Sequence, residues 1–295
     1  MNTPAPTYSV TLYTLQADTG QLCELLREQW HTEPVEVLAH GRDEALLEIY
    51  FDQEIQALLA ARALESRPEV RAVTLRTTRP EDWQAMFRRH FSTREIGDRL
   101  RIAPVWERDR LPRDDRLTLF IEPGLGFGTG EHFTTRFCLE ALDRLFAADP
   151  PASLLDIGTG SGILAIAAAR LGCPRVLATD HDADSLRCAA ENLALNQLAG
   201  RVEFQPADIE SDSLPGPFEV VCANLYSNLL KDCALRIARA SSRWLLLSGI
   251  REDEADAVSD VYRRIGATET GRDGDGEWAG LVFRVDLSPP TAINP

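Results

Sequence analysis

An apolar run that turns abruptly into a glycine-rich loop, and then into a helix, constrains the fold of this 295-residue chain more than any other feature. The run Ser153–Asp156 has the hydrophobicity of a buried strand, glycines alternate with other residues over 158–162, and the Ala-rich segment Ile163–Leu171 is typical of a helix. A second apolar run, Val176–Asp180, ends in an acid. This order of strand, glycine turn, helix, strand and terminal acid predicts a nucleotide-binding β-α-β unit.

The spacing of the glycines and the acid before them indicate which nucleotide-like ligand such a unit would hold. Dinucleotide sites carry G-x-G-x-x-G, whereas this loop reads G-x-G-x-G. Asp156 stands two residues before Gly158, where a carboxylate would repel a pyrophosphate and would suit a cation, such as the amino acid end of S-adenosylmethionine (SAM). Asp180 is expected to accept hydrogen bonds from a ribose diol. We interpret the unit as a SAM site; the alternatives are an NAD-dependent oxidoreductase and a glycine turn in an ordinary α/β domain.

The composition favours an acidic cytoplasmic enzyme. The formal net charge is −15 at pH 7, which argues against sequence-specific nucleic-acid binding and is consistent with a basic partner. Apolar runs fall short of the roughly 18 residues of a membrane helix, and the N-terminus lacks the pattern of a secretory signal. The six cysteines form no C-x-x-C pair and no metal-ligand spacing, so we expect free thiols and no metal site.

Strand-like and helix-like segments alternate through the region 100–287, which we interpret as one α/β domain followed by a loose tail over 288–295. The expected elements beyond the glycine unit are Leu117–Ile121, Thr134–Phe146, Ala183–Asn196, Val202–Gln205, Val220–Ala223, Leu229–Ala240, Trp244–Ser248, Asp253–Ile265 and Gly276–Asp286. Such alternation predicts a parallel sheet covered by helices, with ligands at the carboxyl ends of the strands. Asp156, Asp180, Asp208 and Asn224 all fall at or just after strand ends.

Residues 1–78 carry a different pattern, which predicts a small α+β domain. The expected elements are Tyr8–Tyr13, Gly20–Gln29, Val35–Val37, Ala45–Phe51, Glu54–Glu65 and Val70–Leu75. Their β-α-β-β-α-β order is that of the ferredoxin-like split unit. An amphipathic helix over 81–91 is expected inside a linker at 79–99, because Trp83, Phe87 and Phe91 recur at helical spacing.

A second glycine cluster precedes the first one along the chain. Residues 122–135 read Glu-Pro-Gly-Leu-Gly-Phe-Gly-Thr-Gly-Glu-His-Phe-Thr-Thr, which is a loop that covers something. Thr134 or Thr135 is expected to cap the helix that follows. His132 has no second histidine near it in sequence, so a structural role is preferred over a base or a metal ligand.

This second cluster resembles the hallmark of the PrmA family of ribosomal protein L11 methyltransferases, and the resemblance covers nearly the whole chain. Further matching segments are Glu81–Trp83, Asp156–Gly162, Ala223–Tyr226, Leu247–Ile250 and Gly276–Trp278. It implies a Rossmann-like class I methyltransferase domain, with a seven-stranded and mostly parallel sheet, preceded by a ferredoxin-like substrate-recognition domain. The chain departs from the pattern at Glu131, Phe133, Ser227 and Asn228, which flank the substrate channel more than the cofactor.

The resemblance also implies roles for named residues. The implied cofactor contacts are Thr135, Gly158, Asp180 and Asn224, with Asp156, Gly160 and Phe127 lining the same pocket and Asp208 reaching the adenine amino group. The implied reaction is repeated methylation of α-amino and lysine ε-amino groups of L11, with S-adenosylhomocysteine as product and a ribosome contact as a further expectation. The arginine-rich stretch 67–116 would suit ribosomal RNA, although a solvated linker face is the simpler interpretation.

Asn224 is our candidate for aligning the target amine, because an amide accepts hydrogen bonds from the amine without adding charge. The amine must be neutral to attack a methyl group, and no general base is assigned. Two alternatives stay open at this point: Asn224 orders the turn at its strand end, or the chain is a SAM-dependent enzyme for another protein lysine or a small amine. A non-catalytic SAM-binding scaffold on the ribosome is a third.

Overall fold

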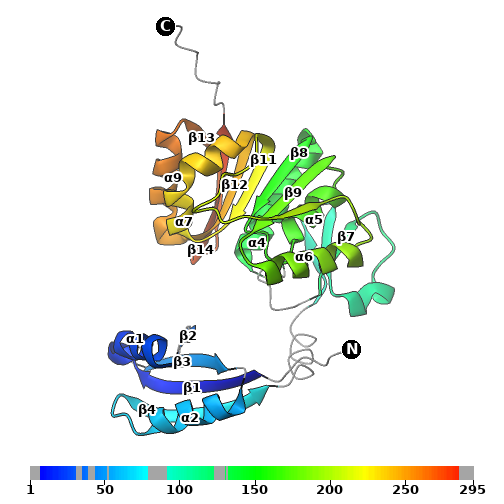
Figure 1. Ribbon diagram of the computed structural model, residues 1–295. Coiled ribbons are helices and arrows are strands. Elements are labelled where there is room, and N and C mark those ends of the chain that lie inside the picture. The colour runs from blue at the N-terminus through cyan, green and yellow to red at the C-terminus, as the bar shows by residue number, and fades with distance from the viewer. Residues whose placement is uncertain are drawn as a thin grey trace. The chain divides into compact units, whose positions relative to one another are not determined.

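The computed structural model describes residues 7–30, 35–38, 44–51, 53–78, 92–122, 130 and 132–285. The chain forms two compact units, residues 1–90 and residues 91–295, which are drawn together in Figure 1. The amphipathic helix expected over 81–91, the tail over 288–295 and Phe127 lie outside the described residues.

The first unit has the predicted β-α-β-β-α-β order. Its elements are β1 (Thr7–Leu15), α1 (Thr19–Trp30), β2 (Val35–Leu38), β3 (Glu44–Phe51), α2 (Glu54–Glu65) and β4 (Val70–Thr78), with a 3₁₀ turn at Gln16–Asp18. The strands form one antiparallel sheet in the order β2-β3-β1-β4. Alternate residues of β1 and β3, such as Leu12 and Leu47, are fully buried together with Leu22, Leu26 and Leu64 of the helices. One face of the sheet therefore packs on the helices, as period-two strands with a single buried face require.

The second unit is built on a seven-stranded sheet in the order β10-β9-β8-β11-β12-β14-β13. The strands are β8 (Ser153–Ile157), β9 (Arg175–Asp180), β10 (Glu203–Pro206), β11 (Phe218–Asn224), β12 (Ser241–Arg251), β13 (Ala267–Gly274) and β14 (Trp278–Val285). The pairs from β10 to β12 are parallel, and β14 runs antiparallel to both of its neighbours. The predicted mostly parallel sheet is confirmed, and the edge strand β13 was not expected because its sequence is polar and holds two glycines.

Helices cover both faces of this sheet (Figure 1). They are α4 (Phe133–Ala148), α5 (Ile163–Arg170) and α6 (Ala183–Leu195) on one face, and α7 (Ser227–Asp232), α8 (Ala234–Ala240) and α9 (Ala255–Arg264) on the other. Strand β8 packs against the helices on both faces of the sheet. Leu154 packs with α4 and α5, whereas Leu155 packs with the helices of the opposite face. Both leucines are fully buried. Central parallel strands need such continuous apolar runs, which is why they were predictable from sequence.

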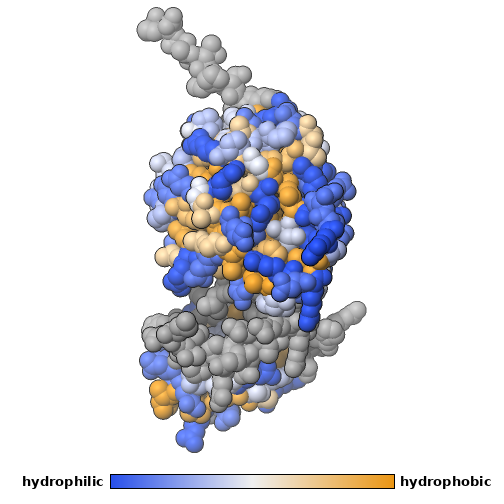
Figure 2. Space-filling model, turned by 90° about the vertical axis from the view of Figure 1, so that its right-hand side faces the viewer, coloured by the Kyte–Doolittle hydropathy of each residue, from blue (hydrophilic) through white to orange (hydrophobic). Residues whose placement is uncertain are grey.

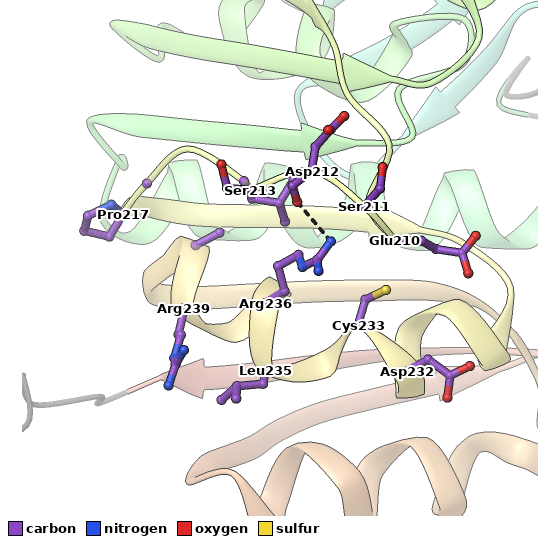
Figure 3. A pocket seen from close by; sticks show the side chains of 13 residues that line it. Glu210, Ser211, Asp212, Ser213, Pro217, Asp232, Cys233, Leu235, Arg236 and Arg239 are labelled. Atoms are coloured by element: carbon purple, nitrogen blue, oxygen red, sulfur yellow. Dashed lines mark hydrogen bonds between the residues drawn. The ribbon is translucent and has the colours of Figure 1, made fainter.

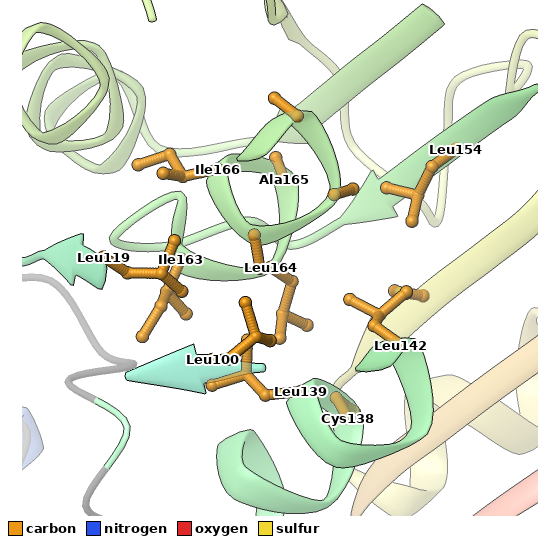
Figure 4. Packing of buried hydrophobic residues seen from close by; sticks show 14 of the residues in the cluster. Leu100, Leu119, Cys138, Leu139, Leu142, Leu154, Ile163, Leu164, Ala165 and Ile166 are labelled. Atoms are coloured by element: carbon orange, nitrogen blue, oxygen red, sulfur yellow. The ribbon is translucent and has the colours of Figure 1, made fainter. Parts of the chain in front are cut away.

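A small third sheet extends the core beneath α4 and α5. It contains β5 (Arg94–Ile96), β6 (Leu100–Ala103) and β7 (Leu117–Phe120) in that order, and a 3₁₀ helix spans Val105–Arg110. Figure 4 shows Leu100 and Leu119 of this sheet facing Leu139 and Ile163 of the two helices. Strand β6 was not expected from sequence, because Arg101 interrupts its apolar pattern. The structure buries Arg101 to 2 % exposure by pairing it with Asp114.

The helix expected over Leu229–Ala240 is two helices, α7 and α8, which meet at Cys233. None of the helices described is long and apolar enough to cross a bilayer. On the face of the second unit presented in Figure 2, hydrophobic patches are interspersed with hydrophilic side chains.

Candidate active site

The glycine loop between β8 and α5 is held by the buried carboxylate of Asp156. This side chain is 1 % exposed and accepts hydrogen bonds from the Thr159 hydroxyl (2.7 Å) and the Ala165 N–H (3.3 Å). The acid thereby joins the strand end, the loop and the first turn of the helix. Burial raises the pKa of Asp156 to about 6, because an apolar surrounding disfavours the charged form.

The loop glycines are required by their geometry. Gly158, Gly160 and Gly162 have φ values of 68°, 52° and 81°. Residues with a Cβ rarely adopt this backbone conformation. A Cβ on Gly158 would lie 2.5 Å from Cδ2 of Leu225, and a Cβ on Gly162 would lie 2.8 Å from that of Ala189. The N–H groups of Gly158 and Thr159 both donate to the carbonyl of Thr179, at 2.8 and 2.9 Å, so the loop turns back onto β9.

Asp180 ends β9 beside this loop. Its carboxylate is 8 % exposed and accepts from the N–H groups of Gly160 and Asp182, both at 3.0 Å. A carboxylate has about four acceptor positions, so these two bonds fix its orientation and leave capacity for a ligand.

Asp208 follows β10, the next strand outward. Its carboxylate accepts from the Glu210 N–H (2.8 Å) and the Ser211 hydroxyl (3.2 Å), which closes a local turn. Since β10, β9, β8 and β11 are parallel neighbours, Asp208, Asp180, Asp156 and Asn224 lie at the carboxyl edge of four successive strands. The structure therefore brings these four predicted residues to one edge.

Asn224, at the end of β11, carries a buried acceptor with no partner. Its Nδ2 donates to the hydroxyl of Thr135 at 3.5 Å, across 89 residues of sequence, whereas its Oδ1 is buried and makes no hydrogen bond. Thr135 lies in the first turn of α4 and is 1 % exposed. The two predicted contacts Thr135 and Asn224 are thus adjacent in space.

The start of α4 corrects one expectation. The helix is capped by His132, whose Nδ1 accepts from the Thr134 N–H (3.4 Å) and lies 2.8 Å from the Thr134 hydroxyl, and not by Thr134 or Thr135. The His132 ring also packs edge-on against Trp278, with centroids 5.0 Å apart. A ring nitrogen can accept from a helix N–H as a hydroxyl does, which leaves Thr135 free to point toward Asn224. These contacts agree with the structural role preferred for this histidine.

Gly249 supports the same strand end, a role that sequence reasoning did not assign to it although the matching segment Leu247–Ile250 contains it. Gly249 has φ 81°, and a Cβ there would lie 2.9 Å from the carbonyl carbon and 3.0 Å from the nitrogen of Leu225. The Leu225 N–H donates to the Ser248 carbonyl at 3.0 Å. Leu225 is therefore enclosed between Gly158 of the cofactor loop and Gly249. The sequence signal that could have identified this contact was a glycine separated by one residue from the apolar run Trp244–Leu247 of β12.

The model of the family described as "Ribosomal protein L11 methyltransferase (PrmA)" matches residues 7–286. The chain belongs to this family. A ribosomal protein L11 methyltransferase of Pelobacter propionicus is 36% identical over 276 residues, which cover 86% of this chain and 88% of that protein. One of Geobacter metallireducens is 41% identical over 214 residues, or 72% of this chain and 69% of that protein. The crystal structure of a ribosomal protein L11 methylase from Lactobacillus delbrueckii subsp. bulgaricus aligns with a TM-score of 0.59 and 30% identity, over 65% of this chain and 98% of that one.

One cavity of this PrmA-family chain lies away from the glycine loop, and no residue of that loop lines it. It has a volume of about 730 Å³ and opens between residues 210–217 and helices α7 and α8 (Figure 3). Arg236 crosses it to donate to the carbonyl of Asp212 at 2.9 Å. None of the predicted cofactor residues lines it, so the strand-edge residues, and not this cavity, are the candidate site. Among the residues described, no three His, Cys, Asp or Glu side chains gather as metal ligands would.

The raised pKa of Asp156 predicts how the stability of this PrmA-family chain changes with pH. Since the folded-state value of about 6 exceeds the ordinary 3.8, protonation of Asp156 stabilises the folded state as the pH falls through 6, and the gain is complete below about pH 4. The gain is at most about 3 kcal/mol. The free energy of unfolding is measured by urea denaturation at pH 7 and at pH 5. When the pH is lowered from 7 to 5, this free energy should rise more, or fall less, in the wild type than in Asp156→Asn. An equal change in both proteins would contradict the assignment.

Proposed function

We propose that the chain is a SAM-dependent protein N-methyltransferase that methylates the N-terminal α-amine and lysine ε-amines of ribosomal protein L11, with S-adenosylhomocysteine as product. Membership of the family supports methyl transfer to this substrate. The structural observation that carries the proposal is the buried, unpaired Oδ1 of Asn224 beside the glycine loop. An acceptor kept without a partner costs about 1–3 kcal/mol of desolvation, so a folded chain retains it where a ligand completes it.

The residues at the strand edge fit SAM. Gly158 and Gly160 present backbone without side chains, so a ligand can approach closely. Asp156 places a buried carboxyl near the loop, where a positive charge on the ligand would favour its ionised form. Asp180 has acceptor capacity for a ribose diol, and Asp208 stands at the next strand for the adenine amino group. We propose Phe127 and Thr135 as further contacts.

When bound, SAM supplies a methyl group activated by positively charged sulfur. The protein then needs to supply a neutral amine in the correct orientation, and most of the acceleration comes from this alignment. The amine nitrogen forms a bond to the methyl carbon as the carbon–sulfur bond breaks, the sulfur keeps the bonding electrons, and the proton of the product ammonium goes to solvent. Asn224 accepts an N–H of the amine and thereby directs its lone pair, and no general base is required.

We propose residues 1–78 as the substrate-recognition domain, 79–99 as the linker, 100–287 as the methyltransferase domain and 288–295 as a tail. We further propose that the enzyme acts in the cytoplasm, where it contacts L11 and the ribosome that carries it. The names of the curated relatives favour L11 over another protein lysine or a small amine as acceptor.

Methylation of L11 is tested directly by mass. The purified chain, incubated with SAM and unmodified L11 of its own organism, is expected to add mass in steps of one methylene to the N-terminus and lysines of L11. Asn224→Ala, which removes the unpaired acceptor, serves as the comparison variant. A wild-type protein that binds SAM yet leaves L11 unchanged would contradict the proposed function and would favour another acceptor or a non-catalytic scaffold. Titration with NAD distinguishes an oxidoreductase.

A further inference from the structure

A second buried oxygen without a partner lies three residues beyond Asn224. Ser227, the first residue of α7, is 4 % exposed, and its hydroxyl makes no hydrogen bond. Among the described residues of the second unit, Asn224 Oδ1 and Ser227 Oγ are the side-chain oxygens that are buried and unpaired. Both belong to the same junction between β11 and α7. Two buried acceptors without partners in the short segment from Asn224 to Ser227 are not explained by chance packing, because buried polar groups are nearly always paired.

The Ser227 hydroxyl has no structural task in this fold. Serine at a helix start usually caps the helix, but the N-cap position of α7 is Tyr226 and no side chain provides a cap hydrogen bond there. Serine within a helix can also bond to a carbonyl of the preceding turn, and Ser227 does not. Alanine would fill the same space without the cost of burying an unpaired hydroxyl.

The junction is also within reach of a substrate. Tyr226 lies between the two residues in sequence and is 72 % exposed. The junction that holds the two buried oxygens therefore includes a residue that a partner can contact. Leu225, enclosed by Gly158 and Gly249, joins this junction to the cofactor loop.

The chemistry of the target amine matches two acceptors. A neutral primary amine carries one lone pair and two N–H hydrogens, so both hydrogens must be accepted if the lone pair is to point in one direction. A single acceptor leaves the amine able to rotate about the accepted hydrogen. Each methyl added removes one hydrogen, and a neutral dimethylamine has none to donate.

We propose that Ser227 provides the second acceptor for the target amine, paired with Asn224, and so governs the first methyl transfer more than the last. This inference rests on the proposed function of the same site. It assigns a substrate-contacting role to a buried hydroxyl that makes no hydrogen bond in the folded chain.

The test compares transfer to L11 in two methylation states. In single-turnover reactions with SAM, Ser227→Ala is expected to slow methylation of unmodified L11 by about tenfold, the equivalent of about 1.4 kcal/mol. Methylation of L11 whose amines have been chemically dimethylated beforehand is expected to keep its wild-type rate. Ser227→Cys, which keeps the size but supplies only a weak acceptor, should behave as the alanine variant does.

Two readouts besides activity separate the proposal from other roles. The melting temperature of Ser227→Ala is expected to equal or exceed that of the wild type, since no hydrogen bond is lost. The matched control is Ser259→Ala, because the buried Ser259 hydroxyl does donate to Glu269; its loss should lower the melting temperature by about 2–4 °C and leave the ratio of the two methylation rates unchanged. SAM affinity, measured by calorimetry, should be unchanged in Ser227→Ala.

Three results would overturn the inference. Equal slowing on unmodified and dimethylated L11 would show that Ser227 does not sense the N–H hydrogens. Weaker SAM binding would assign the hydroxyl to the amino group of the methyl donor, and a lower melting temperature would assign it to the fold. If the wild type itself does not methylate L11, the proposed function fails. This outcome can be distinguished from failure of the inference about Ser227, because it is observed with the wild type alone.

Discussion

Replacement of Asp180 by alanine is expected to weaken SAM binding by about a hundredfold or more. The carboxylate ends β9 and is oriented by the N–H groups of Gly160 and Asp182. In the proposed complex it accepts two hydrogen bonds from a ribose diol, each worth about 1.5–3 kcal/mol to a charged acceptor, and a tenfold loss corresponds to 1.4 kcal/mol. Alanine also leaves the Gly160 N–H without its acceptor, so the glycine loop loses a support at the same time.

Calorimetric titration with S-adenosylhomocysteine measures this loss, and Asp182→Ala is the matched control. Asp182 is two residues away and its carboxylate caps α6, accepting from the N–H groups of Asp184 (3.0 Å) and Ser185 (3.2 Å). Its removal should lower the free energy of unfolding by about 1 kcal/mol, as the loss of a helix cap does, while the affinity stays unchanged. Similar affinities in the two variants would mean that Asp180 is a structural residue of the loop.

Gly249→Ala is expected to lower the free energy of unfolding by about 2–5 kcal/mol and to reduce methyl transfer with it. Alanine in a left-handed conformation costs roughly 1–2 kcal/mol, and forcing a methyl group into packed structure costs about 1–3 kcal/mol more. The clash is with the backbone of Leu225, which cannot yield without moving its chain neighbour Asn224. The variant should therefore lose catalytic alignment beyond its loss of stability.

Gly276→Ala separates the two contributions. Gly276 has a similar φ of 92°, but a Cβ there meets nothing within 4 Å. This variant should show the conformational cost alone, about 1–2 kcal/mol in urea denaturation, with methyl transfer unchanged. If Gly249→Ala resembled Gly276→Ala in both stability and rate, the close approach to Leu225 would have no functional role.

The elements that were predicted well are those whose pattern is local. The unit from β8 to β9 was recognisable because apolar strands, glycine spacing and a terminal acid follow one another within 28 residues. The first unit was predictable for a related reason, since strands with one buried face alternate visibly with amphipathic helices.

The elements that were missed depend on distant partners. Strand β6 contains Arg101, and an arginine predicts an exposed position. In the folded chain, an ion pair with Asp114 compensates the charge of Arg101 and allows its burial. Strand β13 is polar and exists because it pairs along β14 at the sheet edge. His132 caps α4 although Thr134 and Thr135 lie beside it and threonine is the more usual residue at a helix cap. In each case a tertiary contact overrode the local preference.

The same division holds for the site. The positions of Asp156, Asp180, Asp208 and Asn224 at or just after strand ends could be predicted from the sequence, because strand ends and glycine turns are encoded by neighbouring residues. The folded chain is needed to see which polar atoms of these residues are paired and which are left for a ligand. Thr135 meets Asn224 across 89 residues, Gly249 encloses Leu225 from another strand, and Ser227 is buried without a partner. Hydrogen-bond pairing depends on distances between segments that are remote in sequence, so the unpaired acceptors that distinguish this site emerge only when the chain is folded.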